Sequence, residues 1–552
     1  MQQQDAAHVV AEAARQYAEE LGRWRQQRRL SKQKLATLMT YDRSYVSHVE
    51  SGSLPPTEDF TRRAEAVLNT ASALWARWEA YEAARIGNAR ASSRSVDRLE
   101  PIASERQRDL KVSPFVAWVA DHSRLSFQDA YGVVVRGVER LAARGPADRY
   151  AEAHRRAQIT RDQLARALAT YYQNPSPHEL GATFYSARVD GVPLALSILV
   201  RPDWLGAAVR LGTNQERFQL AAPDVGTAVR LPEGPALEAA LRRLAAAETS
   251  ATVMVNNPLY RLQDVALSRQ RLQATVTLTD FADYALTMDL LETELVDALA
   301  TAGRGHGDGR GGATVGLPLR DVYLPTVASA LTLSDRLCVG GPVALLAAAR
   351  PSTRHGQREP DYVLLVQERS ARVLNVTGRL AVVPKAFHGP TTEAAEEAHL
   401  SASLERELEE ELLGREDLEQ VSERSFRRID PFHTDQLSEP MRWLVERRQT
   451  DAYRVECVGF GINMVTGNYE FPCLILIDDE EWWERYSGQI EANWEMARVR
   501  RYSSRDTAGL QALAADPRWS NEGLFAFLEG LRRLAELDTV SRVAVPEIEV
   551  GA

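Results

Sequence analysis

The sequence predicts a multidomain protein with an all-α head, a mixed α/β middle region and a C-terminal region of strands and helices. At 552 residues the chain is too long for one hydrophobic core, so about three or four domains are expected. Helical periodicity dominates the head, whereas strand-like alternation first appears near Gly181. We expect domains at 1–87, 101–302 and 315–552, joined by linkers of small, polar or glycine-rich composition at 88–100 and 303–314.

Charge is distributed unevenly along the chain. The net charge is −10, which by itself argues against a protein devoted to nucleic acid. Residues 1–99, however, carry 15 basic and 12 acidic side chains, whereas the remainder carries 51 and 64. A mildly basic head on an acidic body fits a DNA-binding module attached to something else.

Composition also indicates the compartment. Hydrophobic residues make up 44% of the chain, and no apolar run approaches the roughly 18 residues that span a bilayer. The start MQQQDAAHVV suits an amphipathic helix rather than a signal peptide. The three cysteines have no metal-ligand spacing and suit a reducing environment. We therefore expect a cytoplasmic protein without a membrane partner.

The head is organised around the stretch 21–52, which contains two short helical patterns separated by a tight turn. The first opens on Ser31, whose hydroxyl can cap the free amides of the first turn. The second runs from about Asp42 to Glu50, with Val46 and Val49 on its inward face. Ala36 is small enough to let the two helices cross closely.

The polar residues of this stretch resemble the helix-turn-helix of the XRE/Cro-repressor family. Ser31-Lys32-Gln33 would open the positioning helix, and Asp42-Arg43-Ser44-Tyr45-Val46-Ser47 would open the recognition helix. The resemblance implies double-stranded DNA as partner, a recognition helix in the major groove and a homodimer on two half-sites. The residues expected at DNA are Lys32, Gln33, Lys34, Asp42, Arg43, Ser44, Tyr45, Ser47 and His48. A small helical bundle without a ligand is the alternative.

Two further helices complete the head, one through Phe60, Ala64 and Leu68 and one carrying Leu74, Trp78 and Tyr81. The aromatic side chains suit a core or a dimer surface better than base stacking. The region 101–302 reads as helical to about residue 172, then as a hairpin turning at Asp190-Gly191, then as helices at 234–247 and 281–301. No catalytic constellation appears there, so ligand sensing and oligomerisation both remain open.

The second informative stretch follows strand-like residues at 362–388. A helix is expected with Leu400, Leu404, Leu408 and Leu412 four residues apart. Glu407, Glu410 and Glu411 stand at i, i+3 and i+4, which places three carboxylates on one helix face. Such crowding costs stability unless a cation offsets it, and Mg²⁺ prefers oxygen ligands. A solvated acidic face without metal is the alternative.

Residues 406–411 also match the REUxEE core of the Nudix box. The resemblance implies an α/β/α sandwich that binds a nucleoside diphosphate linked to another moiety through Mg²⁺. Glu407, Glu410 and Glu411 would then be metal ligands or catalytic base, and Arg406 would orient them. The chain departs from the box at Thr392 and Ala398, where a glycine and a glutamate belong, and the closing Leu413-Gly414 is reversed.

The remaining C-terminal sequence predicts strands at 454–461 and 470–478 around a turn at 466–468, and a last helix after Asn521. Core positions are the better interpretation for Trp482 and Trp494, and structural roles for His388 and His433. Two functions fit these patterns: a ligand-responsive, sequence-specific DNA-binding regulator, which we favour, and a Mg²⁺-dependent nucleotide pyrophosphohydrolase with a DNA-binding appendage. A scaffold whose head binds protein is a third possibility.

Overall fold

The computed structural model describes most of the chain. The described residues are 2–28, 30–39, 43–50, 58–68, 70, 73–78, 80–81, 110–222, 229–250, 254–302, 316–352, 359–369, 379–413, 437–490, 496–538 and 542–551. They form two compact units, Met1–Arg108 and Asp109–Ala552, which we call the head and the body. The two predicted linkers lie outside the described residues.

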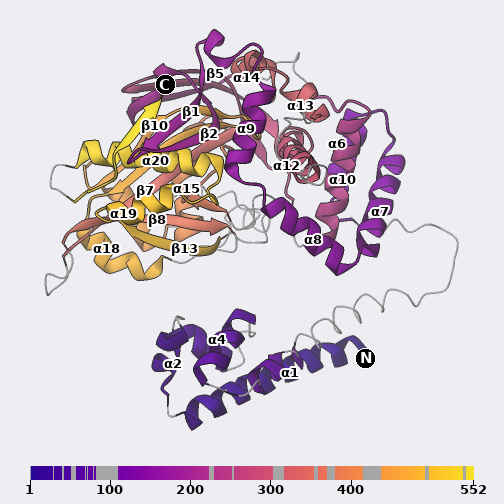
Figure 1. The fold of residues 1–552 in the computed structure, drawn as a ribbon, viewed down its shortest axis with the longest axis vertical. Coiled ribbons are helices and arrows are strands. Elements are labelled where there is room, and N and C mark those ends of the chain that lie inside the picture. Colours follow the sequence, from indigo (N-terminus) through magenta and orange to yellow (C-terminus); the bar gives the residue numbers. More distant parts are fainter. Residues whose placement is uncertain are drawn as a thin grey trace. The chain divides into compact units, whose positions relative to one another are not determined.

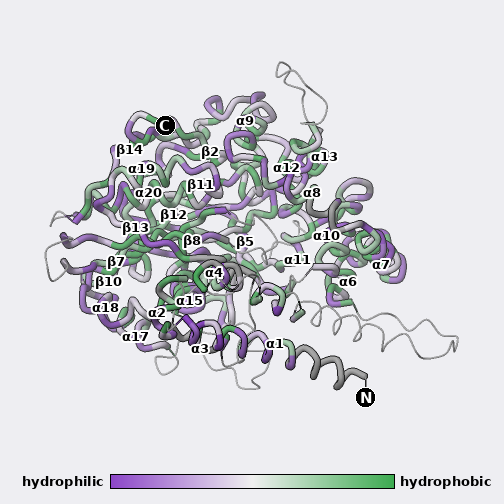
Figure 2. The backbone as a smooth tube through the Cα atoms, turned by 60° about the horizontal axis from the view of Figure 1, so that its bottom comes forward, coloured by the Kyte–Doolittle hydropathy of each residue, from purple (hydrophilic) through white to green (hydrophobic). Residues whose placement is uncertain are grey.

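The head is helical, as its periodicity predicted (Figure 1). It contains α1 (Gln2–Gln27), α2 (Lys32–Met39), α3 (Arg43–Glu50) and α4 (Glu58–Leu68), followed by helical residues 73–78. Hydrophilic and hydrophobic residues alternate along the second half of α1 (Figure 2), and Tyr17 and Leu21 of this half pack into the core with the other helices. The shared core consists of Tyr17, Leu21, Leu35, Ala36, Met39, Val46, Val49, Phe60, Ala64, Leu68 and Leu74. The helix predicted through Phe60, Ala64 and Leu68 is therefore confirmed as α4.

Helices form the first part of the body. They are α6 (Ser113–His122), α7 (Phe127–Ala143), α8 (Pro146–Ala157), α9 (Arg161–Tyr171) and, further along, α10 (Pro235–Thr249). The helix predicted at 281–301 is interrupted: α11 (Phe281–Ala285) ends before α12 (Leu290–Ala302) begins. Asp289 lies in the interruption and is buried, and its carboxylate accepts hydrogen bonds from Arg243 and Tyr284. Because a buried carboxylate needs such partners, Asp289 joins the interruption to α10 and α11.

The body is built on a mixed sheet of 11 strands. One path through it runs β13-β8-β7-β12-β11-β2-β1-β14; β10 pairs with β12 and β3, and β9 pairs with β8. The bounds are β1 Thr183–Val189, β2 Val192–Val200, β3 Leu205–Arg210, β7 Gly340–Arg350, β8 Asp361–Arg369, β9 Leu380–Val382, β10 Tyr453–Gly459, β11 Gly461–Asn463, β12 Tyr469–Ile477, β13 Met496–Ser503 and β14 Ile548–Gly551. A second sheet has the order β4-β6-β5, with β4 at Glu216–Leu220, β5 at Pro258–Ser268 and β6 at Arg271–Asp280.

The large sheet crosses the boundary that the sequence suggested at 303–314. Leu199 of β2 lies opposite Ile462 of β11, and Arg210 of β3 lies opposite Glu456 of β10. Residues 101–302 and 315–552 therefore do not form the two separate domains that we expected. Strands that precede residues 303–314 form backbone hydrogen bonds with strands that follow them. The glycine-rich segment is therefore a connection within one unit of the chain.

Local turn chemistry agrees with the sequence at the β1–β2 hairpin. Asp190 and Gly191 form its two-residue turn, and both have positive φ, 46° and 79°. This is the backbone that an Asp-Gly hairpin turn requires.

Helices cover both faces of the large sheet. Along β7, Leu345 and Ala347 pack into the core that contains α20 (Asn521–Leu537). The alternate residues Leu346 and Ala348 pack into the core that contains α15 (Leu400–Leu412). β7 and β12 are parallel and buried on both faces, which explains their nearly continuous apolar sequences. Among the described helices, none combines the length and apolar character needed to cross a bilayer.

Candidate nucleic-acid interface

The α2–α3 pair has the packing that the sequence predicted. Ala36 and Val46 have no exposed surface and Val49 is 1% exposed. The Ser31 hydroxyl accepts the Lys34 amide N–H at 3.1 Å, so the predicted cap at the start of α2 is confirmed. A small residue at the crossing lets α3 lie close to α2, which fixes the orientation of the helix expected to read DNA.

The outer face of α2 carries polar residues and one exposed hydrophobic residue, Leu38, which is 49% exposed. Gln33 and Lys34 are exposed, whereas Lys32 and Ser47 are half-buried. Lys32 Nζ donates a hydrogen bond to Ser47 Oγ at 3.2 Å, so the structure brings these two predicted residues together across the α2–α3 pair. Lys34 is therefore the freer of the two lysines to approach a phosphate, and Lys32 also connects the helices.

The backbone of α3 carries four more of the predicted residues, Arg43, Ser44, Tyr45 and His48. The side chains of these four, and Asp42 as a whole, lie outside the described residues. Their roles at DNA remain predictions from the sequence.

The far end of α3 is held by a contact that the sequence did not reveal. Arg25 of α1 donates from Nε and Nη2 to the two carboxylate oxygens of Glu50 at 2.7 and 2.6 Å. The two side chains are 12% and 11% exposed. The hydrogen bond to Glu50 raises the pKa of Arg25, and Arg25 Nη1 also donates to the Leu30 carbonyl at 2.7 Å. The partners are 25 positions apart in the sequence, which explains why local periodicity could not find the pair.

Other hydrogen bonds join the remaining helices. Tyr17 and Thr61 connect α1 to α4 through their hydroxyls, 2.8 Å apart in the core. Arg63 of α4 donates to the Met39 carbonyl at the end of α2 at 3.2 Å. The helix pair is thus supported on two sides, as a surface that must hold its shape against DNA requires.

Comparison with known families gives one match. Residues 16–91 match the family model of a helix-turn-helix domain, and this segment contains the last part of α1, the whole of α2, α3 and α4, and the helical residues 73–78. The head is a helix-turn-helix DNA-binding domain. The match does not extend into the body, and no curated protein matches the chain.

Outside the helix-turn-helix domain, α15 carries the residues that suggested a Nudix box. Ten of its thirteen residues are buried, including all four predicted leucines. Glu409 Oε1 and Oε2 accept hydrogen bonds from the Ser438 amide and hydroxyl, each at 2.6 Å. Glu405 pairs with both ends of the Arg448 guanidinium. Carboxylates on this helix thus bind neighbouring elements of the body.

The predicted metal ligands do not assemble into a metal centre in the described part of the chain. Glu411 is 3% exposed and accepts the Lys385 amide N–H at 3.2 Å, whereas Glu407 and Glu410 are half-buried. Within the described residues, no three His, Cys, Asp or Glu side chains are placed to hold a metal ion. Helical spacing put three carboxylates on one face, but the packing of Glu411 against the 384–389 segment turns one of them to another use.

Arg406 is buried, and its Nη1 donates to the Gly389 carbonyl at 3.2 Å, which ties α15 to the segment before it. Its role in orienting a carboxylate stays a prediction from the sequence. Glu397, one residue before the position of the missing box glutamate, is a residue that sequence reasoning missed. It accepts hydrogen bonds from the amides of Thr391, Thr392 and Glu393. Burial raises its pKa, but these bonds and those from the two threonine hydroxyls lower it overall.

The other singled-out residues of the body are structural where they are described. His388 has no exposed surface, its Nδ1 lies 3.0 Å from the Tyr469 hydroxyl, and burial lowers its pKa to about 3. Trp482 is 1% exposed and donates to the Pro440 carbonyl. His433 and Trp494 lie outside the described residues. The three cysteines are free and buried.

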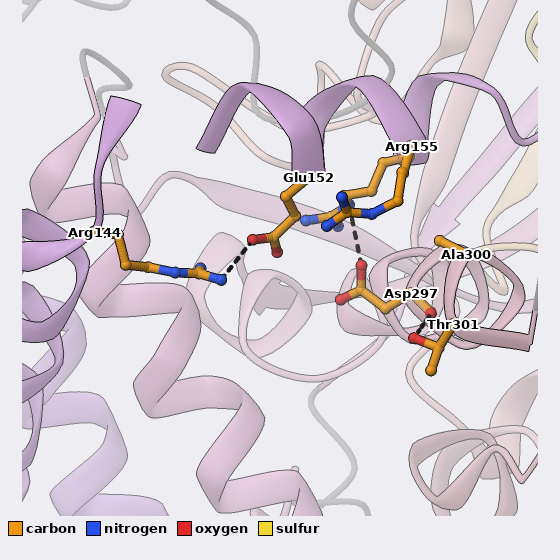
Figure 3. Close-up of a pocket in the computed structure, with 7 residues that line it drawn as sticks. Arg144, Glu152, Arg155, Asp297, Ala300 and Thr301 are labelled. Atoms are coloured by element: carbon orange, nitrogen blue, oxygen red, sulfur yellow. Dashed lines mark hydrogen bonds and ion pairs between the residues drawn. The ribbon is translucent and has the colours of Figure 1, made fainter. Parts of the chain in front are cut away.

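A charged cavity of about 290 Å³ lies where α8 meets α12 (Figure 3). Arg144 pairs with Glu152 at 2.8 Å, and Arg156 pairs with Asp297 at 3.1 Å. Arg155 adds a third guanidinium to the lining. The ion pairs are largely solvent-exposed, so they contribute little stability and leave the cavity nearly charge-balanced.

Proposed function

We propose that this protein is a sequence-specific transcriptional regulator of the XRE/Cro type. α2 would position the domain on the DNA backbone, and the first residues of α3 would contact base edges in the major groove. The observation that carries the proposal is the match of residues 16–91 to a helix-turn-helix domain. The buried crossing at Ala36 and the exposed Gln33 and Lys34 support it, because the crossing packs α3 against α2 and the two polar side chains face solvent.

Two further parts of the proposal concern assembly and ligand. We infer a homodimer, since a symmetric pair of heads binds two half-sites. We also infer that the body binds a small ligand whose presence changes DNA affinity; this requires the ligand to bind two arrangements of the protein unequally. The inference that this ligand is of the nucleotide type and binds with Mg²⁺ depends only on the resemblance of Arg406–Glu411 to the Nudix box.

The experiment selects duplexes from a random-sequence library with the full chain and then measures affinities for the selected and a scrambled duplex. Arg43→Ala and Ser44→Ala should weaken binding to the selected duplex more than to the scrambled one, by roughly 1–3 kcal/mol for a direct base contact. Arg15→Ala is the matched control, because its side chain is 61% exposed on α1, away from α2 and α3 in sequence.

If Arg43→Ala and Ser44→Ala reduce the affinity for both duplexes equally, α3 does not recognise the base sequence. Failure to select any sequence would instead favour a head that binds protein. Light scattering of the protein–DNA complex reports whether two chains bind one duplex.

Hydrolysis by the body receives no specific support from the geometry, because Glu411 and Arg406 bind the loop segment next to α15. Turnover of a nucleoside diphosphate derivative that requires Mg²⁺ and disappears in Glu410→Gln would establish it.

A further inference from the structure

Arg161, the first residue of α9, is a buried cation with few partners. Its side chain is 4% exposed, and neither Nε nor Nη1 has a hydrogen-bond partner within the described residues. Nη2 lies 3.5 Å from Asp162 Oδ1, at the limit of a hydrogen bond, and the Asp162 side chain is 64% exposed. Because burying a charge without partners is costly, an arginine in this state calls for an explanation.

A second guanidinium lies beside it. Arg379, just before β9, donates from Nη2 to the Ile159 carbonyl at 3.2 Å, two residues before Arg161. Burial lowers the pKa of Arg161, and the positive charge of Arg379 lowers it further. Asp516 also lies within electrostatic range of Arg161, but its two oxygens already accept bonds from Arg518 at 3.1 and 2.6 Å. The positive charges of Arg161 and Arg379 therefore lie within electrostatic range of each other, and nearby carboxylates offset them only weakly.

The location adds positive potential. Arg161 begins a helix of 11 residues, whose N-terminus carries the positive end of the helix dipole. Arg379 is half-buried, and Asp162, the residue after Arg161, is exposed. On α12, burial raises the pKa of Glu292 to about 7, and the positive charge of Arg379 partly offsets this increase.

We propose that Arg161 and Arg379 bind a small dianion of the phosphate or phosphate-ester class at the N-terminus of α9. A guanidinium presents planar N–H groups that match the oxygens of such an anion, and two of these positions on Arg161 are unused. The inference rests on the proposed function only in naming the class of ligand to which the regulator responds. The anion site itself requires no DNA contact.

The test measures thermal unfolding and calorimetric binding of the full chain with inorganic phosphate, against chloride at equal ionic strength, without DNA. Phosphate should raise the melting temperature of the wild type. Arg161→Met should lose this shift and bind phosphate at least about tenfold more weakly. Without phosphate, Arg161→Met should melt no lower than the wild type, because the change removes an uncompensated buried charge. Arg166→Met on the exposed side of the same helix should keep the phosphate shift.

A wild type without a phosphate shift, or a shift that survives in Arg161→Met, would overturn the proposal. If Arg161→Met does not fold, Arg161→Lys replaces it: the lysine keeps the charge but not the fork, and phosphate binding that is unchanged in it would also overturn the proposal. A parallel arm with ADP distinguishes the source of the anion, since a shift at lower concentration than phosphate assigns the site to a nucleotide phosphate. Phosphate binding without any change in DNA affinity would leave the anion site standing and reject only the coupling to DNA.

Discussion

Replacing Arg25 with alanine should loosen the recognition helix α3. The change removes two hydrogen bonds to Glu50 and one to the Leu30 carbonyl, and it leaves a carboxylate that is 11% exposed without its cation. Losing one partner of a fully buried ion pair costs roughly 3–5 kcal/mol. Because a tenth of each side chain still meets water, we expect about 2–4 kcal/mol, a large share of the stability of a small domain.

Hydrogen exchange of the full chain measures this loss locally. Amides of α3 should exchange about 30-fold to 700-fold faster in Arg25→Ala, since each 1.4 kcal/mol corresponds to about a factor of ten. Arg15→Ala is the control on the same helix. Its ion pairs with Glu12 and Glu19 are exposed, so the change should leave the exchange of the α3 amides nearly unchanged.

The double variant Arg25→Met with Glu50→Met distinguishes two causes of the loss: the missing ion pair itself, and the cost of leaving the Glu50 carboxylate buried without a partner. It should recover much of the protection, because replacing both partners leaves no uncompensated carboxylate. Equal exchange in Arg25→Ala and Arg15→Ala would refute the assigned role of the Arg25–Glu50 pair.

Three other predictions address DNA binding, the buried acids and the metal. Lys34→Ala should weaken binding to the selected and scrambled duplexes alike, because a phosphate contact does not depend on the base sequence. It should also reduce the slope of log affinity against log salt by about one. Filter binding at several salt concentrations measures this slope, and an unchanged slope would contradict the prediction. Burial raises the pKa of Glu470 to about 8, so the folded protein keeps a proton that the unfolded chain releases, and stability should fall as the pH rises from about 4.5 to 8. Denaturant titrations should show a fall of up to about 1.4 kcal/mol per pH unit, and a smaller one in Glu470→Gln. Mg²⁺ should raise the melting temperature no more than Ca²⁺ at equal concentration, since Glu411 is already engaged by the Lys385 amide; a Mg²⁺-specific shift lost in Glu410→Gln would restore the Nudix-type metal site.

The part of the site that could be predicted was the part governed by neighbours along the chain. The cap at Ser31, the small residue at Ala36 and the inward valines of α3 follow from helical periodicity and end chemistry, which act over a few residues. The Asp190-Gly191 turn is predictable for the same reason, because its backbone needs residues that tolerate positive φ.

The carboxylates of α15 show where such reasoning ends. Their spacing correctly placed Glu407, Glu410 and Glu411 on one helix, but spacing says nothing about what packs against that helix. In the folded chain the Lys385 amide donates to Glu411, and the Ser438 amide and hydroxyl donate to Glu409. These contacts join segments that are far apart in the sequence, so helical spacing could not predict them.

By itself, the sequence determined that a helix-turn-helix domain begins this chain and that helices and strands alternate in the body. Only the tertiary structure decided that strands on both sides of the glycine-rich segment form one sheet, that Arg25 holds α3, and that Arg161 is buried with two guanidinium positions unused. Each of these depends on residues far apart in the chain, and long-range pairing, unlike periodicity, leaves no signal in any short stretch of sequence.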